Sequence, residues 1–350
     1  MSRVSRGRSP RSPQTPRRPL TPRTSLGLLR RSALAAASVT VLSLAASGCV
    51  VVHGEREVLP AATPTEAAEA LKDFTAAYNK ADKAYDRGLD ADYVTGALGA
   101  IDAARLDAGH EISPSGNPSY VPLEFTDTRF TIPKKAGWPR WFVANADANK
   151  GQDARWLLVF TRSNVAEPWA VAYLTLLDAD DVPAFKTDKD GFAEPVPANS
   201  TELAVAPEDL SKDYATFLMD GSGDVFAPGV HTSAWVAQRK KSAIKPGLVT
   251  QYIDEPLGKG DFAPLGLRTA DGGALVFFAT HHYEKQTAAQ GTSIPAQSNS
   301  VLALTTGEIK QSLTLEFVSN QAVLDPGRGA ADKGVEFLSR IQGLTAAQGE

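Results

Sequence analysis

The sequence predicts an α+β protein with two similar halves, each a helical segment followed by a curved antiparallel sheet. Two observations lead to this fold class. In each half, apolar residues first recur at helical spacing and then alternate as they do along strands. Corresponding elements are also similarly spaced, because Leu71 to Trp169 spans 98 positions and Leu210 to Leu313 spans 103. This spacing indicates an internal repeat.

The first 48 residues have the composition of a signal peptide. Met1–Arg31 contains nine arginines and no acidic residue, so this n-region is expected to be disordered. Ala33–Ala46 is apolar and has the length of a signal h-region, whereas a membrane-spanning helix needs roughly 20 residues. A secretory signal has this order: a basic segment, then an apolar segment, then small residues. Residues 1–48 are therefore predicted to be a signal peptide.

The only cysteine of the chain, Cys49, ends the segment Ala46-Ser47-Gly48-Cys49. This segment resembles the lipobox of bacterial lipoproteins, and the alanine-, arginine- and glycine-rich composition resembles that of actinobacterial lipoproteins. The resemblance implies cleavage between Gly48 and Cys49, a lipid on Cys49, and a place on the extracytoplasmic face of the cell membrane. Alternatives are a secreted protein with a free cysteine, or an uncleaved helix that begins near Ser32. Arg30-Arg31 leaves both Sec and Tat export open.

Cleavage before Cys49 leaves an acidic mature chain, with 27 basic and 40 acidic residues. Such a chain repels nucleic acid and anionic lipid head groups, which excludes both as natural partners. Membrane contact should therefore come from the lipid, with residues 49–63 as the lipidated N-terminus and tether.

The first half, residues 64–194, opens with a well-marked helix. Thr63 is the expected N-cap, Pro64 suits the first helical position, and Glu66 completes a capping box. Gly88 suits the end of this helix. A second helix and then three strands are predicted at Asp92–Leu106, Trp138–Ala144, Arg155–Arg162 and Trp169–Leu177.

Residues 195–206 contain prolines and alanines, and they are predicted to link the first half to the second, residues 207–350. A helix is expected to begin after Ala206 and to end near Gly221. Asp271-Gly272 is a hairpin signal between two apolar runs. The other predicted elements are a helix at Ser233–Ser242 and strands at Leu265–Thr269, Ala274–Glu284, Val301–Thr305 and Ser312–Ser319.

The order of elements in each half resembles the cone-shaped nuclear-transport-factor-2-like and cystatin-like folds. In those folds a curved sheet wraps a long helix, which implies a pocket inside the cone. The whole mature chain also resembles uncharacterised actinobacterial lipoproteins, a resemblance that implies no activity.

Four of the five tryptophans lie in the predicted first sheet, at Trp138, Trp141, Trp156 and Trp169. Aromatic faces stack well on sugars and other flat ligands, so these side chains are candidates for an apolar or carbohydrate-binding pocket. The alternative is that they fill the core between sheet and helix, which is the usual place for tryptophans that alternate along strands.

The sequence predicts no metal site. His281-His282 lies on a strand, where neighbouring side chains point to opposite faces and cannot easily share a metal. Carboxylates at Asp178–Asp181 and in Lys186–Gly191 invite a calcium site. An EF-hand loop would need an acid at Lys186 and a glutamate at Pro197, so solvated loops are expected instead.

The sequence also predicts no catalytic residue and no cofactor. Ser242-Ala-Ile-Lys245 has the Ser-x-x-Lys form of acyl-transfer enzymes, but Pro246 follows at once and no Lys-Thr-Gly element occurs. No phosphate-binding loop and no dinucleotide fingerprint occur either.

These observations predict a membrane-anchored, extracytoplasmic lipoprotein that acts as a non-catalytic binding or interaction module. Its expected partner is another envelope protein or a small ligand. The alternatives are a hydrolase or isomerase that uses a cone pocket, and a carrier of apolar cargo.

Overall fold

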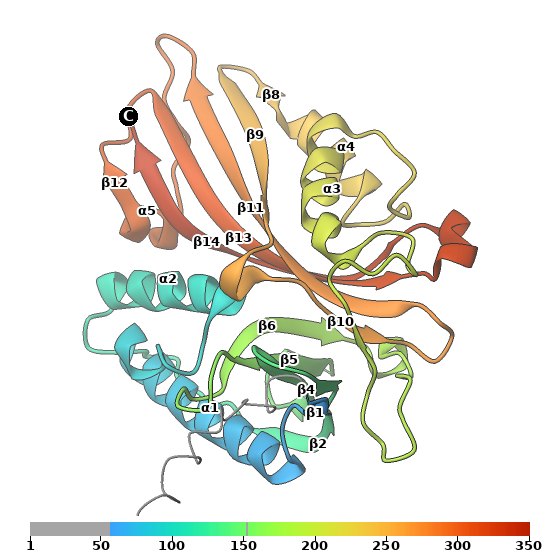
Figure 1. The fold of residues 1–350 in the computed structure, drawn as a ribbon. Helices are drawn as coiled ribbons and strands as arrows, with labels where there is room; N and C mark the ends of the chain where they lie inside the picture. Colours follow the sequence, from blue (N-terminus) through green and yellow to red (C-terminus); the bar gives the residue numbers. More distant parts are fainter. Residues whose placement is uncertain (1–56, 152) are drawn as a thin grey trace, which may run out of the picture. The chain divides into compact units, whose positions relative to one another are not determined.

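The computed structural model describes residues 57–151 and 153–350, which contain both helices and largely antiparallel sheets (Figure 1). The predicted α+β class is confirmed. The predicted signal peptide, Gly48 and Cys49 lie outside the described residues. The similarity of the two halves and the division into two domains remain predictions.

The first sheet has the order β2-β4-β5-β6, with antiparallel neighbours. The helices α1 and α2 and the short 3₁₀ turn η2 precede this sheet in the chain. The strand β1 precedes α1, β3 lies between β2 and β4 in the chain, and the two pair as a separate antiparallel ladder. The bounds are β1 (Leu59–Pro60), α1 (Pro64–Ala84), η2 (Arg87–Leu89), α2 (Gly96–Ile112), β2 (Phe125–Thr131), β3 (Lys134–Lys135), β4 (Arg140–Ala148), β5 (Arg155–Arg162) and β6 (Ala170–Leu177).

The capping box of α1 is confirmed. The Glu66 N–H donates to Thr63 Oγ1 over 3.1 Å, and the Thr63 N–H donates to Glu66 Oε2 over 2.8 Å. The helix ends earlier than the predicted Gly88, because Tyr85 adopts a left-handed conformation with φ of 52°. Gly88 lies instead in the turn η2, where its N–H donates to Asp86 Oδ1.

The second helix begins four residues later than predicted. Residues 93–95 pair with β6 before the helix starts: the Thr95 N–H donates to Val171 O, and the Val171 N–H donates to Tyr93 O, each over 2.9 Å. Backbone groups used in this bridge are not available to a helical turn, so α2 starts at Gly96.

The second sheet has eight strands, and its long strands β11 and β13 pair antiparallel along most of their length. The predicted hairpin at Asp271-Gly272 is confirmed by the pairing of β10 with β11. The bounds are β7 (Pro195–Val196), α3 (Pro207–Asp220), α4 (Ser233–Ser242), β8 (Ile244–Lys245), β9 (Leu248–Leu257), β10 (Leu265–Arg268), β11 (Ala274–Ala288), α5 (Asn299–Leu304), β12 (Thr305–Gly307), β13 (Ser312–Asp325) and β14 (Glu336–Gly349), with short 3₁₀ turns at η3 (Ala179–Asp181), η4 (Gly260–Phe262) and η5 (Arg328–Lys333).

The strand predicted at Val301–Thr305 is wrong. Most of this segment is the helix α5, which Ser298 caps by accepting a hydrogen bond from the Val301 N–H over 3.3 Å. A short apolar run does not distinguish a strand from one turn of helix, and here the N-cap decides the outcome.

The central strands of both sheets are packed on both faces (Figure 1). The helix α1 packs on one face of the first sheet, and α3 packs on one face of the second. The remaining faces meet in a shared core that contains Leu157 and Val159 from β5 and Leu275 and Phe277 from β11. The helix α2 contacts β6, β13 and β14 and so lies between strands of both sheets.

A network of charged side chains joins α1 to α2. Arg105 on α2 donates to Asp102 over 2.8 Å and to Asp82 on α1 over 2.6 Å. Asp90 and Asp102 are only 1% and 3% exposed. Burial and the nearby Asp102 charge raise the pKa of Asp90 to about 8, so this carboxyl group is protonated at neutral pH.

The shared core leads to a prediction about cooperativity. We expect Leu157→Ala to lower the free energy of unfolding by about 3 kcal/mol, because it removes a fully buried side chain between the sheets. Urea unfolding followed by both tryptophan fluorescence and far-ultraviolet circular dichroism should give coincident transitions. Val165→Ala is the control, since Val165 is 76% exposed. Separate transitions would contradict a shared core.

The buried Asp90 leads to a prediction about pH. Its folded pKa lies above its ordinary value of 3.8, so between about pH 4 and 8 the folded protein holds a proton that the unfolded chain has lost. This group therefore makes stability fall as the pH rises. We expect the stability of Asp90→Asn relative to wild type to rise by several kcal/mol between pH 4 and pH 8, measured by urea unfolding, because each unit of pKa shift is worth about 1.4 kcal/mol. Equal changes at both pH values would contradict a protonated Asp90, and the exposed Asp92→Asn serves as control.

Candidate functional site

The structure does not bring the four candidate tryptophans together. Trp141 is 2% exposed and lies in the core between the sheets, whereas Trp156 and Trp169 lie in the core under α1. Trp138 is 39% exposed, with the guanidinium groups of Arg140 and Arg162 each 5.6 Å from its ring centroid. A pocket lined by all four side chains does not form, because Trp141 lies on the opposite face of the first sheet from Trp156 and Trp169, and Trp138 is exposed before the start of β4.

Other motifs also have structural partners. The loop carboxylates Asp188 and Asp190 bind Lys134 at 2.5 and 3.1 Å. His281 and His282 differ in exposure: the first hydrogen-bonds Tyr283 over 3.2 Å, and the second is fully buried. Within residues 57–151 and 153–350, no group of three or more His, Cys, Asp or Glu is arranged to hold a metal ion.

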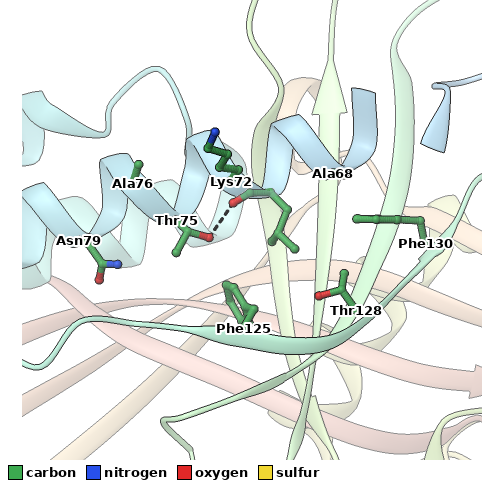
Figure 2. A pocket seen from close by; sticks show the side chains of 9 residues that line it. Ala68, Lys72, Thr75, Ala76, Asn79, Phe125, Thr128 and Phe130 are labelled. Carbon is green, nitrogen blue, oxygen red and sulfur yellow. Dashed lines mark hydrogen bonds between the residues drawn. The ribbon is translucent and has the colours of Figure 1, made fainter. Parts of the chain in front are cut away.

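An open groove of about 440 Å³ runs between α1 and β2 (Figure 2). The helix supplies one wall and the strand supplies the other, and most of the lining surface is apolar. The lining residues are Ala68, Leu71, Lys72, Thr75, Ala76 and Asn79 from α1, and Phe125, Thr128 and Phe130 from β2.

A bulge in β2 places its side chains along the groove. The register against β4 shifts between Thr126 and Arg129, and Asp127 has φ of 42°. Arg155 holds the bulge from inside the sheet, because its guanidinium donates to Asp127 O over 2.9 Å and to Asp127 Oδ2 over 2.8 Å. The bulge thereby brings Phe125, Thr128 and Phe130 to the same wall.

Aromatic packing supports the floor of the groove. The ring of Phe125 lies 5.7 Å from that of Trp156, and Phe130 lies 6.1 Å from Phe142, both in edge-to-face geometry. Trp156 therefore lies one layer below the groove and supports it without lining it.

Most polar groups in the groove are already engaged. The Asn79 amide pairs with the backbone of Leu123, donating to its carbonyl over 2.9 Å and accepting from its N–H over 2.7 Å. The Thr75 hydroxyl donates to Leu71 O over 2.6 Å (Figure 2). Lys72 is the one charged lining residue, and it is exposed. The groove thus offers apolar contact, with a single positive charge at its edge.

The groove also borders an open sheet edge. In the described part of the chain, β2 pairs only with β4, so the backbone groups on its other side have no strand partner. On the helix, Ala68 and Ala76 are exposed and small, which keeps the groove open.

The sequence predicts no strand at Phe125–Thr131 and hence no groove. The segment is rich in phenylalanine and threonine, which strands favour, and this composition is the signal that could have identified this wall. The buried side chains of Asp82, Asp90 and Asp102 are a second unpredicted cluster, but none of them lines the groove.

Across the described ranges, no helix combines the length and apolar character that crossing a membrane requires. No solved structure is significantly similar to the chain.

Residues 58–349 match the model of a family described as a domain of unknown function, DUF8094. An uncharacterised lipoprotein of Streptomyces coelicolor is 66% identical over 92% of this chain and 96% of its own length. An uncharacterised lipoprotein of Streptomyces avermitilis is 62% identical over 91% of this chain and 96% of its own. A second S. coelicolor lipoprotein is 25% identical over 88% and 91% of the two chains. The chain therefore belongs to the DUF8094 family and is homologous to uncharacterised lipoproteins of Streptomyces.

Proposed function

We propose that the protein is a lipid-anchored, extracytoplasmic binding module that receives an extended apolar segment of another envelope protein in the groove between α1 and β2. The observation that carries this proposal is the open apolar groove beside the unpaired edge of β2.

An extended segment fits both features of this surface. Its backbone would pair with the free edge of β2, as in recognition by strand addition, which supplies affinity without regard to side chains. Alternate side chains of the segment would point into the groove, because the side-chain period of a strand is two residues. Contacts with Leu71, Phe125 and Phe130 would then select apolar side chains.

The openness of the groove favours a segment over a small ligand. A small-molecule site commonly encloses about 70–90% of its ligand, which an open groove does not do. Catalysis is disfavoured there because the amide of Asn79 and the hydroxyl of Thr75 are already engaged. Apart from Lys72, the groove contains no titratable side chain that would serve as an acid or base.

The lipid would place this module at the membrane. The lipobox-like segment Ala46–Cys49 and the lipoprotein relatives support a lipid on Cys49. Each buried CH₂ of an acyl chain contributes roughly 0.8 kcal/mol to membrane binding, so two chains anchor firmly. Tethering raises the effective concentration of the groove near envelope partners.

Cys49→Ser tests the anchor. Without the thiol no lipid can be attached, so we expect most of the protein to leave the membrane fraction, as measured by quantitative immunoblotting after fractionation. Ser47→Ala is the matched control, and it should remain in the membranes. Retention of Cys49→Ser as an integral protein would show that a different part of the chain provides the anchor.

Photocrosslinking tests the groove. A photoreactive amino acid at Ala76 of the full-length protein in native membranes should form a protein adduct of discrete mass. The same amino acid at Asp73 is the control, because Asp73 is exposed on α1 but does not line the groove. A second variant, Ala68→Trp, fills the groove and should reduce the adduct at least fivefold.

Mass spectrometry of the adduct decides between the proposal and its rivals. A crosslinked peptide with alternating apolar residues supports strand addition at β2. A lipid adduct would favour a carrier of apolar cargo instead. Equal adducts at positions 73 and 76 would show that the groove is not a specific site.

A further inference from the structure

The second sheet carries polar side chains on the face that α3 and α4 cover. Thr280, Ser319 and Gln321 are at most 1% exposed and bind one another over 2.8 to 3.0 Å. His282 is fully buried on β11 and stacks on Phe317 at 4.7 Å. The covered face of a sheet is usually apolar, and the polar groups buried there normally each have a hydrogen-bond partner.

Two arginines in this region have very different partners. Arg239 on α4 forms a bidentate pair with Asp254 on β9, at 2.6 and 3.0 Å, and both residues are at most 5% exposed. Arg340 on β14 has no carboxylate within ion-pair distance among the described residues. Its Nε and Nη2 atoms are buried and have no hydrogen-bond partner in the described chain.

Further unpaired donors lie beside Arg340. Both guanidinium groups lie close to the Trp235 ring, with Arg239 Cζ 5.3 Å and Arg340 Cζ 4.9 Å from its centroid. In the described structure, the Trp235 Nε1–H is buried without an acceptor, and neither ring nitrogen of His282 has a hydrogen-bond partner. A buried donor without an acceptor bears its full desolvation penalty, so these groups favour an acceptor brought by a ligand.

The electrostatics agree with this geometry. Burial lowers the pKa of Arg340, and the nearby Arg239 charge also lowers it. Burial likewise lowers the pKa of His282, so its imidazole is neutral at pH 7 and offers one N–H donor. Asp254 pairs directly with Arg239, whereas Arg340 has no directly paired carboxylate in the described chain and is influenced by the Glu284 charge only at longer range.

We propose that Arg340, Trp235 and His282 form a binding site for a carboxylate, separate from the groove between α1 and β2. The Nε and Nη2 atoms form one edge of the guanidinium group, whose two parallel N–H bonds match the two oxygens of a carboxylate. The indole N–H and the imidazole N–H supply further donors. A single positive charge favours a monoanion over a doubly charged phosphate.

The neighbouring Glu284 is the internal rival for this site. Its Oε1 lies 3.8 Å from His282 Nε2, and its side chain is 22% exposed. Trp235, Glu284 and Arg340 are each partly accessible, so a ligand can approach past them. The Glu284 charge should weaken the binding of any carboxylate by repulsion.

The experiment titrates sodium acetate into the purified full-length lipoprotein in detergent at pH 7, with sodium chloride holding the ionic strength constant. ¹⁵N–¹H spectra report the arginine Nε–H and tryptophan Nε1–H signals. We expect saturable shifts of Arg340 and Trp235 with a dissociation constant on the order of millimolar. Arg340→Lys should bind at least tenfold more weakly, because lysine lacks the planar fork.

Three further variants keep the test decisive. Arg129→Lys is the control, since the Arg129 side chain is 71% exposed, and it should bind as wild type does. Trp235→Phe keeps a ring but removes the N–H donor, so acetate should bind severalfold more weakly. Glu284→Gln removes the rival charge, so acetate should bind severalfold more tightly.

The outcomes separate the explanations. No saturable shift in the wild-type protein, or unchanged binding by Arg340→Lys, overturns the proposal. Tighter binding of inorganic phosphate than of acetate overturns the assignment to a carboxylate. If acetate binds, N-acetyl-glycylglycine and its amide identify the source of the carboxylate. Binding of the acid that is tighter than that of acetate, with no binding of the amide, indicates a peptide C-terminus. Otherwise a free small carboxylate is the ligand.

Discussion

The packing of the two sheets against each other is the constraint on which the rest of the structure depends. Tyr173 from the first sheet is fully buried in this interface, stacks near Phe277 from the second, and donates from its hydroxyl to Ala263 O over 3.0 Å. Because one face of each sheet is used in this contact, each sheet has one face left for helices. The groove and the Arg340 cluster are consequences, since each lies on the side of its sheet that faces away from the shared core.

Burial on both faces also explains the sequence of the central strands. Trp156–Phe160 in β5 and Leu275–Ala279 in β11 are continuous apolar runs without polar alternation. A polar residue in such a setting has no route to water and needs a protein partner. Arg155 has several, including Asn145 and Asp127, and the carboxylate site of Arg340 is proposed because its partner is missing.

Local signals were enough to predict the elements that local chemistry fixes. The capping box of α1, the end of α3 at the left-handed Gly221 and the hairpin at Asp271-Gly272 are all confirmed. The strands β9 and β14 went unpredicted because their residues are mostly polar or half-exposed, and their conformation comes from pairing with β11 and β13. The two candidate sites also depend on tertiary structure, so local sequence did not predict them. The groove needs the bulge of β2, and the carboxylate site needs residues from α4, β11 and β14 to meet.

The folded body also limits how far the groove could lie from the membrane. Leu59 and Pro60 already pair with β3, and the Arg140 guanidinium donates to Pro60 O over 2.9 Å, so the body begins at Leu59 and not after residue 63. With the lipid on Cys49, as we propose, nine residues, 50–58, would separate the anchor from the body, which makes ten residue steps. At about 3.5 Å per residue, even a fully extended tether spans only about 35 Å. Since α1 follows within a few residues, the groove would meet segments exposed close to the membrane, which favours a membrane-associated partner over one free in solution.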